Sequence, residues 1–178
     1  MFEGTGLERG RSRLVEEAWV LVRWMFFLTP LPWPNRIKAM LLRLFGAEVG
    51  VGVNIRPRVN IHFPWKLKLG NHCWIGDSCE LLNLEPIVIE DNSALAHEVY
   101  LAAASHDIRS RSLRYANKPI VIRKGCWIAT RAFIGPGVEI GEQSVVGACA
   151  VVVKSVPPYS VVTGPQAEVR MRREFERD

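Results

Sequence analysis

The chain has 178 residues, of which 48% are hydrophobic and 23% charged, so its composition is that of a folded globular protein and excludes a disordered or fibrous one. The 23 Lys and Arg against 18 Asp and Glu give a formal net charge of +5, too small and too dispersed to indicate a nucleic-acid-binding protein but compatible with an anionic ligand. The length predicts one domain with a small appendage.

The appendage is predicted to be helical and to cover residues 1–48. An apolar stretch at 14–28 is followed by the proline-rich break TPLPWP and then by a second helix, which Asn35 can cap and Gly46 can end. The second helix has an apolar face made of Ile37, Met40, Leu41 and Leu44.

Two interpretations of this appendage stay open. It can be a helical pair packed over the end of the main domain, or a basic amphipathic contact with a membrane surface. The apolar run at 18–28 is too short to span a bilayer, which takes about 20 residues, and the opening residues do not resemble a cleavable signal peptide.

The main domain is a hexapeptide repeat. Every sixth residue of its second half is aliphatic, namely Ile122, Ile128, Ile134, Ile140, Val146 and Val152. Four positions after each comes a small or β-branched residue, namely Cys126, Ala132, Val138, Ser144, Ala150 and Val156. The same rule holds upstream in three sets that are offset by two residues: Val49, Ile55, Ile61; Leu69, Ile75, Leu81; and Ile89, Leu95, Leu101.

Repeats of six residues are typical of parallel β-helices, in which three short strands close one triangular coil and the aliphatic positions stack into columns. The blocks 49–66, 69–86, 89–106, 122–139 and 140–157 predict about five coils within an all-β solenoid at 49–164. Residues 165–178 are predicted to be a basic tail or a short helix.

The four cysteines, at 73, 79, 126 and 149, form no CxxC pair and have no zinc-ligand spacing. We expect small reduced thiols rather than disulfides or a metal site, and three of them fall in the column of small residues.

One excursion interrupts the repeat, at residues 107–121, and His106 stands where it begins. Repeat proteins place insertions on one face, which is often the binding face, so His106 is a candidate site residue. Its alternative is an ordinary exposed or structural histidine.

At this point the sequence resembles a known family. The repeat, the loop with SHD at 105–107 and the segment CWIATRAFIGPGVEIGEQSVVGACAVVVKSVPPYSVVTG are similar to the hexapeptide-repeat acetyltransferases. Within them, LFGAEVGVGVNIRP, FPW and LLNLEPIVIEDN resemble the colanic acid biosynthesis acetyltransferases of bacterial exopolysaccharide clusters, and the likeness covers about residues 35 to 164. The resemblance implies a left-handed coil, a cytoplasmic homotrimer with sites between subunits, and acetyl-CoA as the co-substrate for a sugar hydroxyl.

The resemblance also assigns roles to residues near the loop. His106 matches the catalytic histidine, which as a general base would remove the hydroxyl proton during attack on the thioester. Asp107 would orient it, or hold the loop or the acceptor. Asn83 matches an acceptor-binding asparagine, whose alternative is a turn between coils.

For CoA, the resemblance implies that the pantetheine arm lies against Ala129, Thr130, Gly147 and Ala148. Lys154 matches a lysine near the nucleotide, and Arg170, Arg172 or Arg173 could meet the phosphates. The loop cations Arg109, Arg111 and Arg114 are further candidates for an anionic cofactor or acceptor. The chain departs from the family at GPQAE (164–168), where Glu168 replaces a cation.

Three alternatives stay open. A nucleotide-sugar N-acyltransferase would use an amine acceptor, and a non-catalytic solenoid scaffold would bind no acetyl-CoA. A zinc-dependent carbonic anhydrase shares the β-helix, but the four histidines, His62, His72, His97 and His106, lack the spacing of that family, so no metal is expected.

Overall fold

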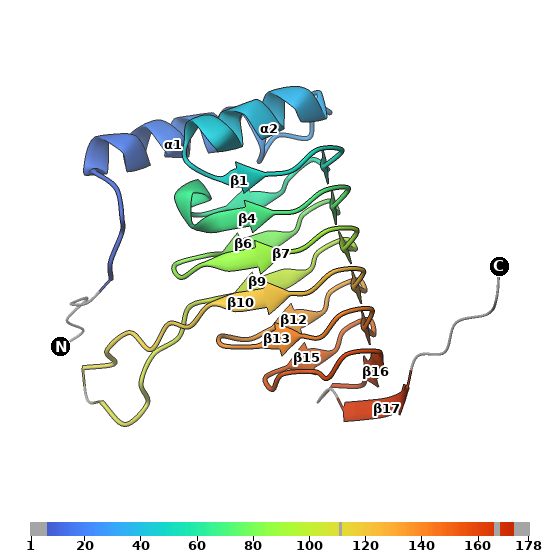
Figure 1. Ribbon diagram of the computed structural model, residues 1–178. Coiled ribbons are helices and arrows are strands. Elements are labelled where there is room, and N and C mark those ends of the chain that lie inside the picture. The colour runs from blue at the N-terminus through green and yellow to red at the C-terminus, as the bar shows by residue number, and fades with distance from the viewer. Residues whose placement is uncertain (1–6, 111, 166–167, 173–178) are drawn as a thin grey trace.

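The fold is a solenoid of short parallel strands with two helices across its N-terminal end, seen in a computed structural model that describes residues 7–110, 112–165 and 168–172 (Figure 1). Helix α1 (Arg13–Phe26) and helix α2 (Asn35–Leu44) precede the strands. This arrangement is a left-handed parallel β-helix, as predicted.

Three sheets run along the solenoid, one on each side of the triangle. The first contains β1 (Glu48–Val49), β4 (Leu67–Leu69), β7 (Ile87–Ile89), β10 (Ile120–Ile122) and β13 (Glu139–Ile140). The second contains β2 (Asn54–Ile55), β5 (Trp74–Ile75), β8 (Ala94–Leu95), β11 (Trp127–Ile128), β14 (Val145–Val146) and β16 (Ser160–Thr163), with β17 (Glu168–Arg172) at its edge. The third contains β3 (Asn60–Ile61), β6 (Glu80–Leu82), β9 (Tyr100–Ala102), β12 (Phe133–Ile134) and β15 (Val151–Val152).

The strand register confirms the repeat. Ile122 pairs with Ile89 on one side and Ile140 on the other, and both predicted columns, the aliphatic one and the small one, are buried. The two-residue offsets in the first half of the sequence lengthen the early coils: Glu48 pairs with Lys68, whereas in the late coils Val121 pairs with Glu139. The short helix η1 (Pro64–Lys66) fills one of the longer corners.

The C-terminal end differs from the prediction in two ways. The count of five coils is too low, because Val156 bridges to Ile140 and β16 stacks on β14, which begins a sixth coil. In place of a helix or tail, β17 turns back and pairs antiparallel with β16.

Many corners of the solenoid turn through a residue in the left-handed conformation. His72, Glu98 and Arg131 occupy such positions, with φ of 55°, 58° and 60°. The sequence does not predict the left-handed conformation at these corners, because most of the residues there are not glycine.

The helices close the open edge of the first coil. Asn35 Oδ1 accepts a hydrogen bond from the Ile55 backbone N–H (3.0 Å), and Lys38 Nζ donates to the carbonyl oxygens of Ile55 (3.0 Å) and Arg56 (3.2 Å). Trp19 Nε1 donates to the Ile61 carbonyl at 2.9 Å. These side chains satisfy backbone groups that have no strand above them.

One prediction for α2 is therefore wrong. Asn35 does not cap the helix, because its side chain bonds to the coil and Pro34 occupies the N-cap position. The predicted apolar face is divided, since Leu41 packs against the core while Met40 and Leu44 are exposed. Gly46 does end the helix, with φ of 94° and its N–H bonded to the Arg43 carbonyl.

Candidate active site

The excursion between β9 and β10 begins as a narrow hairpin that presents His106. The Asp107 N–H donates to the Arg114 carbonyl and the Ala116 N–H donates to the Ser105 carbonyl, both at 2.8 Å. His106 and Tyr115 are directly opposite in this antiparallel pair. The hairpin holds an exposed histidine outside the solenoid.

Two contacts fix the His106 ring. Nδ1 lies 2.7 Å from the Leu113 carbonyl oxygen, and the ring stacks on Tyr115 with centroids 5.0 Å apart. A carbonyl oxygen can only accept a hydrogen bond, so Nδ1 carries the proton in this contact and, in the neutral ring, Nε2 is the basic nitrogen. In this tautomer Nε2 is the nitrogen that can accept a proton. Nothing in the sequence marks Leu113 or Tyr115 as partners of His106.

Asp107 shapes the loop. Its carboxylate accepts the Arg109 backbone N–H at 2.9 Å, and its carbonyl accepts the Ser110 N–H at 3.1 Å. These contacts favour the loop-holding interpretation of Asp107 over the one in which it orients His106. Of the loop arginines, Arg109 and Arg114 are exposed, and Arg111 lies outside the described residues.

Asn83 is fully buried, and its side-chain amide links the second coil to the backbone of the first. Its Oδ1 accepts the backbone N–H groups of His62 (3.0 Å) and Phe63 (2.9 Å), and its Nδ2 donates to the Phe63 carbonyl. This geometry fits the turn asparagine and weighs against acceptor binding, which stays a prediction.

The residues predicted to line the CoA arm share one corner. Ala129 and Thr130 follow β11, and Gly147 and Ala148 follow β14 one coil further on, with the Ala129 N–H bonded to the Val146 carbonyl at 2.8 Å. Ala129 is buried, Thr130 and Gly147 are half-buried, and Ala148 is exposed. The corner therefore offers small side chains and a close approach to the backbone.

This corner and His106 lie at opposite ends of the third sheet. The corner leads into β12, whereas the His106 loop leaves the sheet after β9, and these two strands run parallel. A single chain therefore does not bring His106 and Thr130 together. Lys154 follows β15 and is exposed at the same end of the sheet as the loop.

The predicted phosphate ligands fall at the C-terminal end. The backbone of Arg170 and Arg172 is part of β17, but their side chains, like all of Arg173, lie outside what the structure describes. Glu168 begins the same strand.

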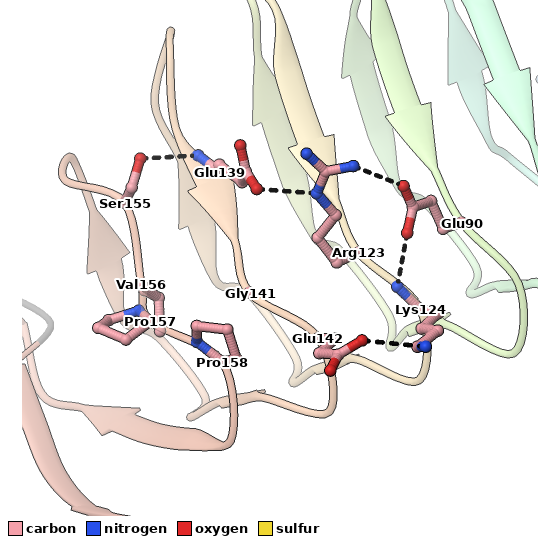
Figure 2. A pocket seen from close by; sticks show the side chains of 10 residues that line it. All are labelled: Glu90, Arg123, Lys124, Glu139, Gly141, Glu142, Ser155, Val156, Pro157 and Pro158. Atoms are coloured by element: carbon pink, nitrogen blue, oxygen red, sulfur yellow. Dashed lines mark hydrogen bonds and ion pairs between the residues drawn. The ribbon is translucent and has the colours of Figure 1, made fainter.

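The hollow in Figure 2, of about 600 Å³, lies elsewhere, along the first sheet and its following corner. Arg123 donates to Glu90 and to Glu139, each at 2.8 Å, and Lys124 pairs with Glu142 at 3.1 Å. The Glu139 hydrogen bond is the largest cause of the raised pKa of Arg123. Because these cations are already paired with carboxylates, the hollow is a poor binding site for CoA phosphates.

No disulfide joins the four cysteines, and three of them are buried. Burial raises the pKa of the Cys79 thiol to about 12, so it stays protonated at neutral pH. Cys149 is exposed, because it takes a left-handed corner position rather than the buried column. Across residues 7–110, 112–165 and 168–172 no three His, Cys, Asp or Glu residues group as metal ligands would.

The comparisons with known proteins identify the family. The family model described as bacterial transferase hexapeptide (six repeats) matches residues 119–154. "Putative colanic acid biosynthesis acetyltransferase WcaF" of Escherichia coli (strain K12) is 41% identical over 169 residues, which cover 94% of this chain and 93% of that protein. The chain belongs to this family of hexapeptide-repeat acetyltransferases.

More distant relatives agree on the fold. Galactoside O-acetyltransferase of Escherichia coli (strain K12) is 29% identical over 133 residues, covering 72% of this chain and 65% of that protein. The crystal structure of a hexapeptide-repeat acetyltransferase from Vibrio cholerae O1 biovar eltor, complexed with acetyl coenzyme A, has a TM-score of 0.83 at 25% identity and covers 98% of this chain and 94% of its own. The family is thus one of acyl-transferring enzymes.

Proposed function

We propose that the enzyme transfers the acetyl group of acetyl-CoA to a sugar hydroxyl in the biosynthesis of an exopolysaccharide or another surface glycan. The observation that carries the proposal is the His106 ring, whose Nδ1 donates to the Leu113 carbonyl and whose Nε2 is thereby the basic nitrogen. The sugar as acceptor is supported by the names of the relatives, a colanic acid acetyltransferase and a galactoside O-acetyltransferase.

His106 supplies the base that the reaction needs. As the sugar oxygen attacks the thioester carbonyl, Nε2 takes the hydroxyl proton, and a tetrahedral intermediate forms without a covalent enzyme adduct. The C–S bond then breaks, the acetyl ester remains on the sugar, and the imidazolium returns the proton to the CoA sulfur. Stabilisation of the oxyanion falls to a backbone N–H or a hydroxyl, and Thr130 is the candidate.

The active site is proposed to lie between subunits of a homotrimer. His106 and the corner with Ala129, Thr130, Gly147 and Ala148 are at opposite ends of the third sheet, so a second subunit is needed to complete the site. Exposed aromatic side chains support association: Trp74 and Trp127 are on the second sheet, and Tyr100 stacks on Phe133 at 5.7 Å on the third. Such outward aromatics are typical of surfaces that a partner covers.

The reaction is proposed to take place in the cytoplasm. Acetyl-CoA is made there, and four cysteines without a disulfide suit a reducing compartment. In the part of the chain that the structure describes, no helix has the length and apolar content of a membrane span.

The test follows free CoA release from acetyl-CoA with a panel of sugars, lipid-linked sugars and, for the N-acyl alternative, amino sugars. His106→Ala is expected to lower kcat about 10²- to 10⁴-fold, the usual contribution of a general base. His72→Asn is the matched control: it removes a histidine at a corner that holds none of the predicted site residues, and asparagine tolerates the left-handed φ of 55° there. Equal CoA release by wild type and His106→Ala would rule out the proposed mechanism.

A further inference from the structure

The outward faces of α1 and α2 are apolar. On α2, Asn35, Lys38 and Leu42 turn toward the coil, while Met40 and Leu44 on the opposite side are 58% and 75% exposed. Leu41 still packs against the core, but Met40 and Leu44 leave a large part of the apolar stripe uncovered in the described chain, while Leu42 and Lys38 hold the helix on the solenoid.

Helix α1 repeats the arrangement. Trp19 is buried and bonds to the first coil, and the opposite face exposes Leu21 (67%) and Trp24 (71%), together with Leu14 and Met25. Both helices lie across the same end of the solenoid (Figure 1). We call this surface of Leu14, Leu21, Trp24, Met25, Met40 and Leu44 the end face.

Positive charge accompanies the end face. Residues 7–44, which include both helices, contain seven Lys and Arg against three Asp and Glu, a formal net charge of +4. On α2, Arg36 is exposed near Met40, whereas the guanidinium of the exposed Arg43 donates to the Val49 and Gly50 carbonyls of the coil. The two acidic residues of α1 are both paired, Glu16 with Arg9 and Glu17 with Arg13.

We infer that the end face docks on a lipid bilayer that carries anionic headgroups. Apolar side chains with a tryptophan among them, flanked by arginines, are what an interfacial helix presents to a membrane: the apolar atoms enter the acyl boundary and the guanidinium groups meet lipid phosphates. Helices lying across the end of the solenoid can both lie flat on such a surface. Membrane docking needs no acetyl transfer, so the two proposals can fail separately.

The test is co-sedimentation of the full-length chain with vesicles of phosphatidylcholine alone and of phosphatidylcholine with phosphatidylglycerol. We expect binding to the anionic vesicles that falls as salt is added. Leu21→Glu should reduce the partition coefficient at least tenfold, and Arg36→Glu should reduce it on the order of tenfold, given about fivefold per cation near the surface.

Ile108→Glu is the matched control, because it makes the same apolar-to-acidic change at a residue that is 90% exposed on the loop, away from the helices. It should bind vesicles as the wild type does. The inference is wrong if the wild type stays in the supernatant with anionic vesicles, or if Leu21→Glu sediments with them undiminished. It is equally wrong if the end face drives association of the protein with itself, seen by light scattering as concentration-dependent growth that Leu21→Glu abolishes without any vesicle binding.

Discussion

At the scale of single residues, Asn83 is the side chain whose surroundings are most informative. Its amide is fully buried and bonds to three backbone groups of residues 62 and 63. Asn83→Ala should lower the free energy of unfolding by about 1–3 kcal/mol, because the Phe63 N–H loses its acceptor, whereas the His62 N–H keeps the Leu81 carbonyl at 3.3 Å. Denaturant unfolding measures this loss.

The matched control is Asn60→Ala, which removes a half-buried amide that donates to the Glu80 carboxylate at 2.9 Å. It should cost less than about 1 kcal/mol, the usual range away from a buried network. A stable Asn83→Ala protein with a raised KM for the sugar would instead support the acceptor-binding role.

His106 shows how far sequence reasoning reaches at this scale. Its position at the break in the repeat made it a candidate, but its partner is a backbone carbonyl, which any residue can provide. Leu113 presents that carbonyl from a left-handed conformation, with φ of 49°, that its side chain gives no reason to expect. The candidate base was therefore identifiable from the sequence, and the contact that sets its tautomer was not.

At the scale of elements, the strands were predictable and the orientation of α2 was not. In stacked coils the buried positions recur at a fixed spacing along the chain. The aliphatic residues that fill them, such as Ile122, Ile128 and Ile134, are therefore visible in the sequence as a repeat. The sequence showed an apolar face on α2 but left open whether it meets the solenoid. The first coil has unpaired backbone groups, and satisfying them with Asn35 and Lys38 leaves Met40 and Leu44 exposed on the opposite side.

Lys38 makes this contact testable through pH. Burial lowers its pKa to about 8, so the folded chain loses the proton there, whereas the unfolded chain keeps it until about pH 10.4. Between these values the unfolded state binds more protons, so the contribution of Lys38 to stability rises with pH, by on the order of 1–2 kcal/mol. Lys38→Met should lack this rise.

The measurement is urea unfolding of both proteins at pH 7.5, 9 and 10. The other ionisable groups are common to the two, so the difference between their free energies of unfolding isolates Lys38. A difference that stays constant over this range would contradict the assigned burial.

At the scale of the whole molecule, the solenoid separates the two groups of residues proposed to form the active site. The rigid third sheet keeps His106 at one end and the small-residue corner at the other. Closed three-fold association would place the loop of each subunit beside the corner of the next. The sequence repeat does not predict such an arrangement between subunits, because it reflects contacts within one chain only.

Mixed trimers test this account most directly. His106→Ala removes the base, and Ala148→Glu places a bulky charge at the exposed corner position. The two inactive variants are co-expressed with different tags, trimers carrying both tags are isolated, and CoA release is compared with that of the wild type. Wild-type subunits carrying the same pair of tags set the full rate.

In every trimer that holds both variants, one site pairs an intact His106 with an intact corner from the neighbouring subunit. The account therefore predicts about one third of the wild-type rate for the isolated mixed trimers, as cyclic symmetry requires. A rate no higher than that of either variant alone would contradict a site shared between subunits.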